Sequence, residues 1–240
     1  MRRLWSAIRW EVRLQFRNGF YYAAGFVAVL FIIGLQYLPA AYWPLAMPVL
    51  VMGNMTMNTF YFMAALVLLE KDDGVLTGLV LTPLRQGEYL WAKLLSLALL
   101  TLVENGVIVT AVVVTAGVGV YFNPLLLAAG IVLLSFINAL YSFMLVIRYE
   151  SVNSFIFPSV FWAMVLSIPL LQYFGLVDTP LMYLHPVQAP LLLLTGAFQP
   201  MPAWTWLYGV VYGAVWVAIL YRLARRAFYR FVILPRGLAM

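Results

Sequence analysis

Six continuous apolar runs, each long enough to cross a lipid bilayer as an α-helix, constrain this chain more than any other feature of its sequence. A membrane-spanning helix needs about 20 apolar residues, whereas spanning β-strands are shorter and alternate polar with apolar residues. The runs therefore predict an all-α polytopic membrane protein with six transmembrane helices. They fall at residues 20–38, 45–69, 94–120, 124–147, 154–176 and 203–221.

The composition agrees with this class. Hydrophobic residues make up 65% of the chain and charged residues 9%, whereas ordinary soluble domains carry about 25% charged residues. So little polar surface excludes a water-soluble fold, and the length suits a single transmembrane domain over residues 1–240. The chain contains no cysteine, which excludes disulfide bonds and cysteine-ligated metals.

The basic residues are confined to one side of the predicted domain. All 14 of them precede the first span, follow the last span in a basic tail (residues 222–240), or lie in the loops after the second and fourth spans. By the positive-inside rule, both termini are expected in the cytoplasm, with the protein in the cell membrane. The net charge of +6 then reflects contact with membrane lipids, not with nucleic acid. The opposite loops, at 39–44, 121–123 and 177–202, hold no basic residue.

Residues 1–18 have the spacing of an amphipathic helix. Apolar residues recur every four positions on one side, and arginines recur on another. This pattern is typical of a helix lying in the headgroup layer, with arginines toward anionic phosphates. A cytosolic extension of the first span is the alternative. The apolar positions are Leu4, Ile8, Val12 and Phe16, and the arginines are Arg9, Arg13 and Arg17.

The segment 177–202 carries five prolines around an apolar centre that is too short to span. This pattern favours a pair of short re-entrant helices between the fifth and sixth spans, on the extracellular side. It also contains His185, for which a capping or packing role is expected rather than catalysis.

The sequence offers little for enzymatic chemistry. With a single histidine, the chain cannot form a two-histidine metal site, and it lacks the GxSxG pattern of serine hydrolases. It also lacks the GxxxxGK[ST] loop that binds nucleotide phosphates. We therefore expect no catalytic residue, no metal and no cofactor bound by this chain.

Polar residues within the spans are the candidate functional groups. Glu104 lies eleven residues past Lys93, which is about 16 Å along a helix at roughly 1.5 Å per residue. An intramembrane carboxylate is costly and points to function. At similar predicted depth lie Asn54, Asn58, Asn105 and Asn138. Two interpretations stay open: hydrogen bonds between helices, or a substrate or cation pathway.

The cytoplasmic segment 71–88 places an apolar stretch beside charged residues. Gly74 ends the second span's helix after an acidic turn, and Thr82-Pro83 ends a short helix that begins at Val75. An apolar helix at this position must be covered. The surrounding mixture of acids and bases favours a protein partner over lipid.

At these residues the sequence resembles the permease subunits of type-2 ABC transporters. Their loop between spans two and three reads as a charged cluster, then Gly-Thr-Leu-Glu, two hydrophobic residues, Thr-Pro-Leu and a later Gly-Lys. The corresponding residues are Glu70-Lys71-Asp72-Asp73, Gly74-Val75-Leu76-Thr77, Thr82-Pro83-Leu84 and Ala92-Lys93. The pattern departs at Val75 and at Thr77, where the family usually has Thr and Glu. The Pro180–Tyr183 pattern and the Leu-rich outer segment also resemble the family, including permeases named as fluoroquinolone exporters.

This resemblance implies an exporter of hydrophobic or amphipathic molecules. It would pair with a second permease copy or a paralogue and with separate ABC ATPase subunits, which bind ATP and Mg²⁺. The alternative is an ion-coupled secondary transporter that uses Glu104. The residues implied in ATPase docking are Glu70, Asp72, Asp73, Gly74, Leu76, Thr77, Leu79, Thr82, Pro83 and Arg85. Those implied in the substrate pathway are Asn54, Asn58, Phe155, Phe161 and Trp162.

Overall fold

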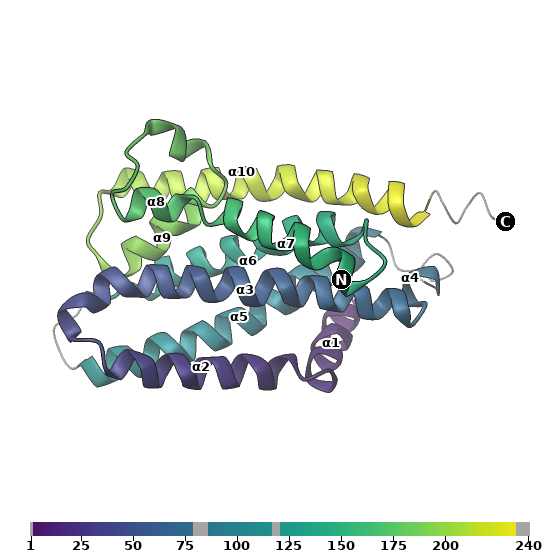
Figure 1. The fold of residues 1–240 in the computed structure, drawn as a ribbon, viewed down its shortest axis with the longest axis horizontal. Coiled ribbons are helices and arrows are strands. Elements are labelled where there is room, and N and C mark those ends of the chain that lie inside the picture. The colour runs from purple at the N-terminus through teal and green to yellow at the C-terminus, as the bar shows by residue number, and fades with distance from the viewer. Residues whose placement is uncertain (1, 79–85, 117–120, 234–240) are drawn as a thin grey trace.

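The computed structural model describes residues 2–78, 86–116 and 121–233, and every regular element in these ranges is helical (Figure 1). This confirms the predicted all-α class. The longer helices are α1 (Arg2–Arg17), α2 (Phe20–Gln36), α3 (Trp43–Asp72), α5 (Gln86–Ala116), α6 (Pro124–Val146), α7 (Val152–Leu166), α9 (Gln188–Phe198) and α10 (Ala203–Phe228). The shorter ones are η1 (Ala40–Tyr42), α4 (Val75–Gly78), α8 (Pro169–Tyr173), η3 (Pro180–Leu184) and η4 (Tyr229–Ile233).

Five helical segments are long and apolar enough to cross a membrane. They are α3, α5, α6, α10 and the α7–α8 segment Val152–Tyr173. The shorter α2 meets the same test together with α1, although the two helices meet at a bend of 64°. Counted this way, the described chain has up to six spans, in agreement with the six apolar runs.

Three spans are longer than their apolar runs: α3 extends slightly at both ends, and α5 and α10 extend by more. Helix α5 begins at Gln86 instead of near residue 94 because its first turns are polar but packed inside the protein, where Tyr89 and Lys93 are buried. Helix α10 continues past residue 221 because Ala224 and Phe228 remain buried on one face while the arginines lie on the other.

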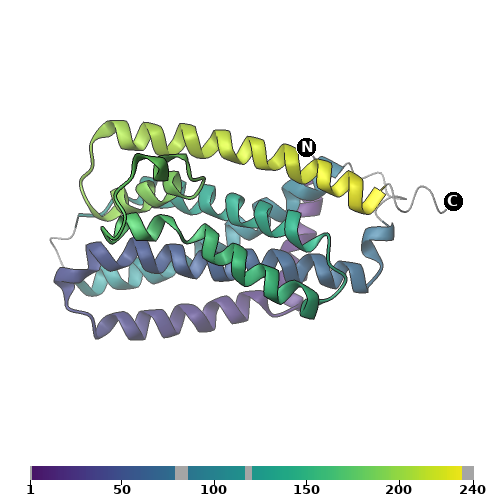
Figure 2. The ribbon, with the colours of Figure 1, turned by 45° about the horizontal axis from the view of Figure 1, so that its top comes forward.

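Helix α6 is the centre of the bundle and packs against α3, α5, α9 and α10. In Figures 1 and 2, α10 and α2 lie along opposite edges of the molecule. Small residues permit the close packing: a Cβ at Gly130 would lie 2.9 Å from Leu194 Cδ2, and one at Gly209 would lie 2.7 Å from Leu193 Cγ. Such close helix approach is typical of membrane bundles.

Helix α9 fills the core beside α6. It lies in the predicted outer segment and packs against α3, α6 and α10, with its leucines largely buried. Before it, η3 is exposed and is tied to α10 by the Tyr208 and Tyr212 hydroxyls, which donate to the carbonyls of Tyr183 and Leu184. Whether this segment re-enters the bilayer stays a prediction.

His185 stands at the start of α9. Its Nδ1 accepts a hydrogen bond from the Val187 amide at 3.2 Å, and burial lowers the pKa of its imidazole below the usual value. The ring thus holds a backbone amide directly before α9, which is compatible with the capping or packing role expected from the sequence.

Helix α1 packs against α5 at one end of the bundle. Its buried residues are polar: Glu11 and Gln15 face inward, and Gln15 Nε2 donates to Ser96 Oγ at 2.8 Å. The expected apolar face is only partly covered, and Phe16 is exposed. Figure 1 places α1, α4 and the end of α10 at the same end of the bundle, with η3 and α9 toward the other.

Candidate functional site

A buried polar cluster joins α3 to α5 about midway along the two helices. Asn58 Nδ2 donates to Glu104 Oε1 at 2.6 Å, and Asn54 Nδ2 donates to the same oxygen at 3.1 Å. Asn54 also donates to Asn105 Oδ1 at 3.1 Å, while its own Oδ1 accepts from Asn58. Glu104 is 5% exposed. Four of the five intramembrane polar residues singled out from the sequence thus form one network.

The donors of this network converge on one carboxylate oxygen. Both amide donors go to Glu104 Oε1, and the buried Oε2 accepts no hydrogen bond from the residues that the structure describes. Half of the carboxylate is therefore available to a further donor. This asymmetry is not readable from the sequence, because it depends on how α3 is rotated against α5.

Asn138 lies apart from this cluster. It is fully buried on α6, and its two amide atoms have no hydrogen-bond partner among the described residues. One turn further along, Ser142 donates to the backbone carbonyl of Phe60 on α3 at 2.5 Å. Asn138 was expected at a depth similar to that of Glu104, but a similar depth does not by itself produce contact. The two side chains would also have to lie on helix faces that are turned toward each other.

A second buried cluster lies where α1, α3 and α5 meet. Lys93 Nζ is 2.6 Å from Glu70 Oε1 and 3.1 Å from Glu11 Oε1, with the lysine side chain fully buried. The Tyr89 hydroxyl donates to Glu70 Oε2 at 2.5 Å. The structure thus places Glu70 inside the protein rather than on an exposed docking face.

Sequence reasoning missed this ion cluster. The available signal was Glu11, an acidic residue among arginines in a helix expected to bind anionic lipid. Its pairing with Lys93 could not be read from spacing, because the two residues lie 82 positions apart. Charged side chains rarely stay buried unless they are paired in this way.

The end of α3 leads directly into the segment expected to bind an ATPase. Asp72 and Asp73 are exposed, Gly74 turns the chain with a positive φ of 70°, and α4 follows at once. Leu76 is 1% exposed, so it anchors α4 to the bundle. The structure describes the expected helix only over Val75–Gly78.

The remaining docking candidates are not described at side-chain level. Leu79, Thr82, Pro83 and Arg85 lie outside the described residues, and Thr77 is described only as part of the α4 backbone. Beside α4, Lys71 Nζ donates to the carbonyls of Ile147 and Tyr149 at 2.8 and 2.6 Å. This contact ties the end of α3 to the loop between α6 and α7.

The aromatic candidates for a substrate pathway are spread over α7. Phe155 is buried against Phe60 and Tyr61, Trp162 packs on Tyr141, and Phe161 is 61% exposed on the outer surface. The hydrogen bonds of the Asn54–Glu104 cluster run between α3 and α5, whereas these rings lie on α7. That the two sets line one cavity at a dimer axis stays a prediction.

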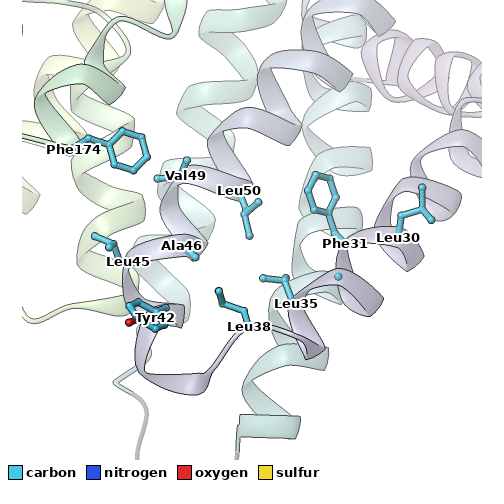
Figure 3. Close-up of a pocket in the computed structure, with 11 residues that line it drawn as sticks. Leu30, Phe31, Leu35, Leu38, Tyr42, Leu45, Ala46, Val49, Leu50 and Phe174 are labelled. Carbon is cyan, nitrogen blue, oxygen red and sulfur yellow. The ribbon is translucent and has the colours of Figure 1, made fainter. Parts of the chain in front are cut away.

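Two pockets flank α2. One, of about 510 Å³, lies between α2 and α3 and has an apolar lining, and Figure 3 shows Phe31 and Leu50 directed toward it from the two helices. The other, of about 160 Å³, lies between α2 and α5, and Glu104 is among its lining residues. Within the described residues, no group of three acids or histidines could hold a metal ion.

Comparison with known proteins agrees with this architecture. The family model described as the fluoroquinolones export permease protein family matches residues 2–236. A protein named a fluoroquinolones export permease in Mycobacterium tuberculosis strain CDC 1551 / Oshkosh is 36% identical over 240 residues, covering 99% of each chain. Its counterpart in strain H37Rv matches to the same extent. The chain is a multi-pass membrane protein that belongs to the fluoroquinolones export permease protein family.

Proposed function

We propose that this chain is the membrane subunit of an ABC exporter, with ATP and Mg²⁺ bound by separate ATPase subunits. The observation that carries the proposal is the segment after α3. Its exposed acids, positive-φ glycine and short helix stand at the end of the bundle shared by α1 and the end of α10. The family membership supports export as the direction of transport.

The contacts around this segment suggest how force would reach the spans. Lys71 binds carbonyls at the end of α6, and Glu70 pairs with Lys93 of α5, which also holds Glu11 of α1. Four helices are therefore joined by charged contacts within one or two turns of α4. A push on α4 by a closing ATPase would move this end of the bundle as a unit, because buried ion pairs are costly to separate.

The proposed cargo is a hydrophobic or amphipathic small molecule, with fluoroquinolones as the first candidates because both named relatives carry that substrate in their names. The few fixed charges and abundant aromatic residues of the chain suit such cargo. In this proposal the chain works in the cell membrane with both termini in the cytoplasm, paired with a second copy or a paralogue.

The docking proposal can be tested by reversing charge at Asp72 and Asp73. The double variant Asp72→Lys/Asp73→Lys should lose co-purification with a co-expressed ATPase subunit and lose ATP-driven efflux, because the exposed acids would face the partner. Asp178→Lys is the matched control, since Asp178 is an exposed acid in the loop before η3. Equal complex yield from all three proteins would contradict the docking assignment.

A second experiment distinguishes the proposed ABC exporter from an ion-coupled secondary transporter. Proteoliposomes containing only this chain should show no transport when a proton gradient is imposed, and transport should appear when the ATPase and ATP are supplied. Gradient-driven uptake without any ATPase would exclude the ABC proposal and favour a carrier that uses Glu104.

A further inference from the structure

The pocket between α2 and α5 combines an apolar lining with one buried acid. Small residues of α2, among them Ala24, Gly25 and Ala28, face α5 there. Val103 and Val107 of α5 are each 52% exposed, so the pocket lies at the outer surface of the bundle. In a membrane this surface contacts lipid. A hydrophobic molecule can therefore enter the pocket directly from the bilayer, without passing through a water-filled channel.

Glu104 supplies the polar end of this pocket. Its Oε1 is fully used by Asn54 and Asn58, whereas its buried Oε2 lacks a hydrogen-bond donor among the described residues. Among the described residues, no lysine or arginine forms an ion pair with Glu104. Buried acids normally find a cation or donors for both oxygens.

We propose that this pocket binds the ammonium end of a hydrophobic organic cation, with the Glu104 carboxylate as its counter-ion. The amides of Asn54 and Asn58 hold the carboxylate in place through its Oε1. The apolar residues of α2 and α5, such as Val29, Ile32 and Leu100, cover the carbon chain next to the ammonium group. The inference rests on the proposed function and narrows its cargo to lipophilic amines.

The size of the pocket fixes which part of the ligand it holds. Its volume of about 160 Å³ is below the roughly 300–1,000 Å³ of sites that enclose a whole drug-sized molecule. It therefore takes one end of a molecule, while the remainder lies along the exposed surface of α5. An inorganic cation fits less well, because it would require several oxygen ligands and the nearby amide oxygens of Asn54 and Asn105 already accept hydrogen bonds.

Binding to the purified chain in lipid nanodiscs tests the proposal. The probe is a decyl chain that carries a photoreactive diazirine and ends in a primary ammonium group, which can donate to Oε2. Its neutral partner ends in a methyl group of the same shape. The charged probe should label peptides of α2 and α5, and the unlabelled charged compound should compete at least about ten-fold better than the neutral one. That factor is the minimum expected of a desolvated charge pair.

Two variants with matched controls separate charge from shape. Glu104→Gln should weaken competition by the charged compound on the order of ten-fold or more and leave the neutral compound unchanged, whereas Glu150→Gln, an exposed acid outside the spans, should change neither. Gly25→Leu should block both compounds by filling the pocket. Gly34→Leu, on the same helix and with equal open space, should block neither.

The outcomes are distinct. Undiminished binding of the charged compound to Glu104→Gln, or equal competition by both compounds in the wild-type chain, would overturn the proposal and leave Glu104 as a protonatable residue of the helix contact. Because the assay contains no ATPase, its failure leaves the ABC proposal standing. Conversely, the result of the docking experiment does not change what is measured here, which is competition for labelling of the isolated chain.

Discussion

At the scale of single residues, the buried charged groups that the structure describes fall into two clusters with different chemistry. In one, Lys93 neutralises part of the charge of Glu11 and Glu70. In the other, the carboxylate of Glu104 accepts hydrogen bonds from the amides of Asn54 and Asn58. In the first cluster the lysine and the carboxylates form ion pairs with one another, which suits a structural contact between helices. In the second cluster one carboxylate oxygen has no hydrogen-bond donor among the described residues, which suits ligand binding.

Removal of the shared cation tests the structural role of the first cluster. Lys93→Met should destabilise the protein by about 3–5 kcal/mol, because two buried carboxylates lose their partner. The triple variant Glu11→Gln/Lys93→Met/Glu70→Gln should recover most of this loss, since it leaves no buried charge in this cluster. Thermal unfolding in detergent, followed by the loss of monodisperse protein, measures both. If Lys93→Met unfolds at the wild-type temperature, the ion pairs of Lys93 do not stabilise the contact between the helices.

At the scale of elements, the sequence predicted where the spans lie but not where the chain between them packs. Long apolar runs determine the spans because an exposed backbone is not tolerated in lipid. By contrast, α9 is an eleven-residue helix that the sequence could not distinguish from a surface segment. Its burial depends on glycines of two other helices, and such a contact leaves no periodic signal within α9 itself.

The fit of α9 against α10 should be sensitive to a single methyl group. At Gly209 an added Cβ would lie 2.7 Å from Leu193 and 3.2 Å from the carbonyl oxygen of Ala189. Gly209→Ala should therefore cost about 1–3 kcal/mol through overpacking. Gly106→Ala is the control, because nothing lies within 4 Å of its added Cβ, and helix propensity alone should make it neutral or slightly stabilising. Equal unfolding temperatures for the two variants would show that α9 is loosely held.

At the scale of the whole molecule, the count of spans could be predicted from hydrophobicity, whereas the side of each loop, inferred from charge, stays a prediction. The candidate site could be predicted only in part. The sequence placed four polar residues at a similar depth in the membrane. They contact one another because the face of α3 that carries the asparagines is turned toward α5. The four are Asn54, Asn58, Glu104 and Asn105. The rotation of each helix is set by packing with every neighbour at once, which the sequence does not encode locally. For that reason a similar depth did not bring Asn138 into the Glu104 network, and the buried contacts of Lys93 were missed.

The two ends of the bundle should lie on opposite sides of the membrane. The chain has no cysteine, so a single introduced thiol reports the side of one position without background. Asp73 and Asp178 are both exposed, the first beside α4 and the second before η3, toward the other end of the bundle. Asp178→Cys should react with a membrane-impermeant maleimide in intact cells, because its loop carries no basic residue and is expected outside. Asp73→Cys should react only after permeabilisation, and labelling of both thiols in intact cells would mean that the two ends do not face opposite compartments.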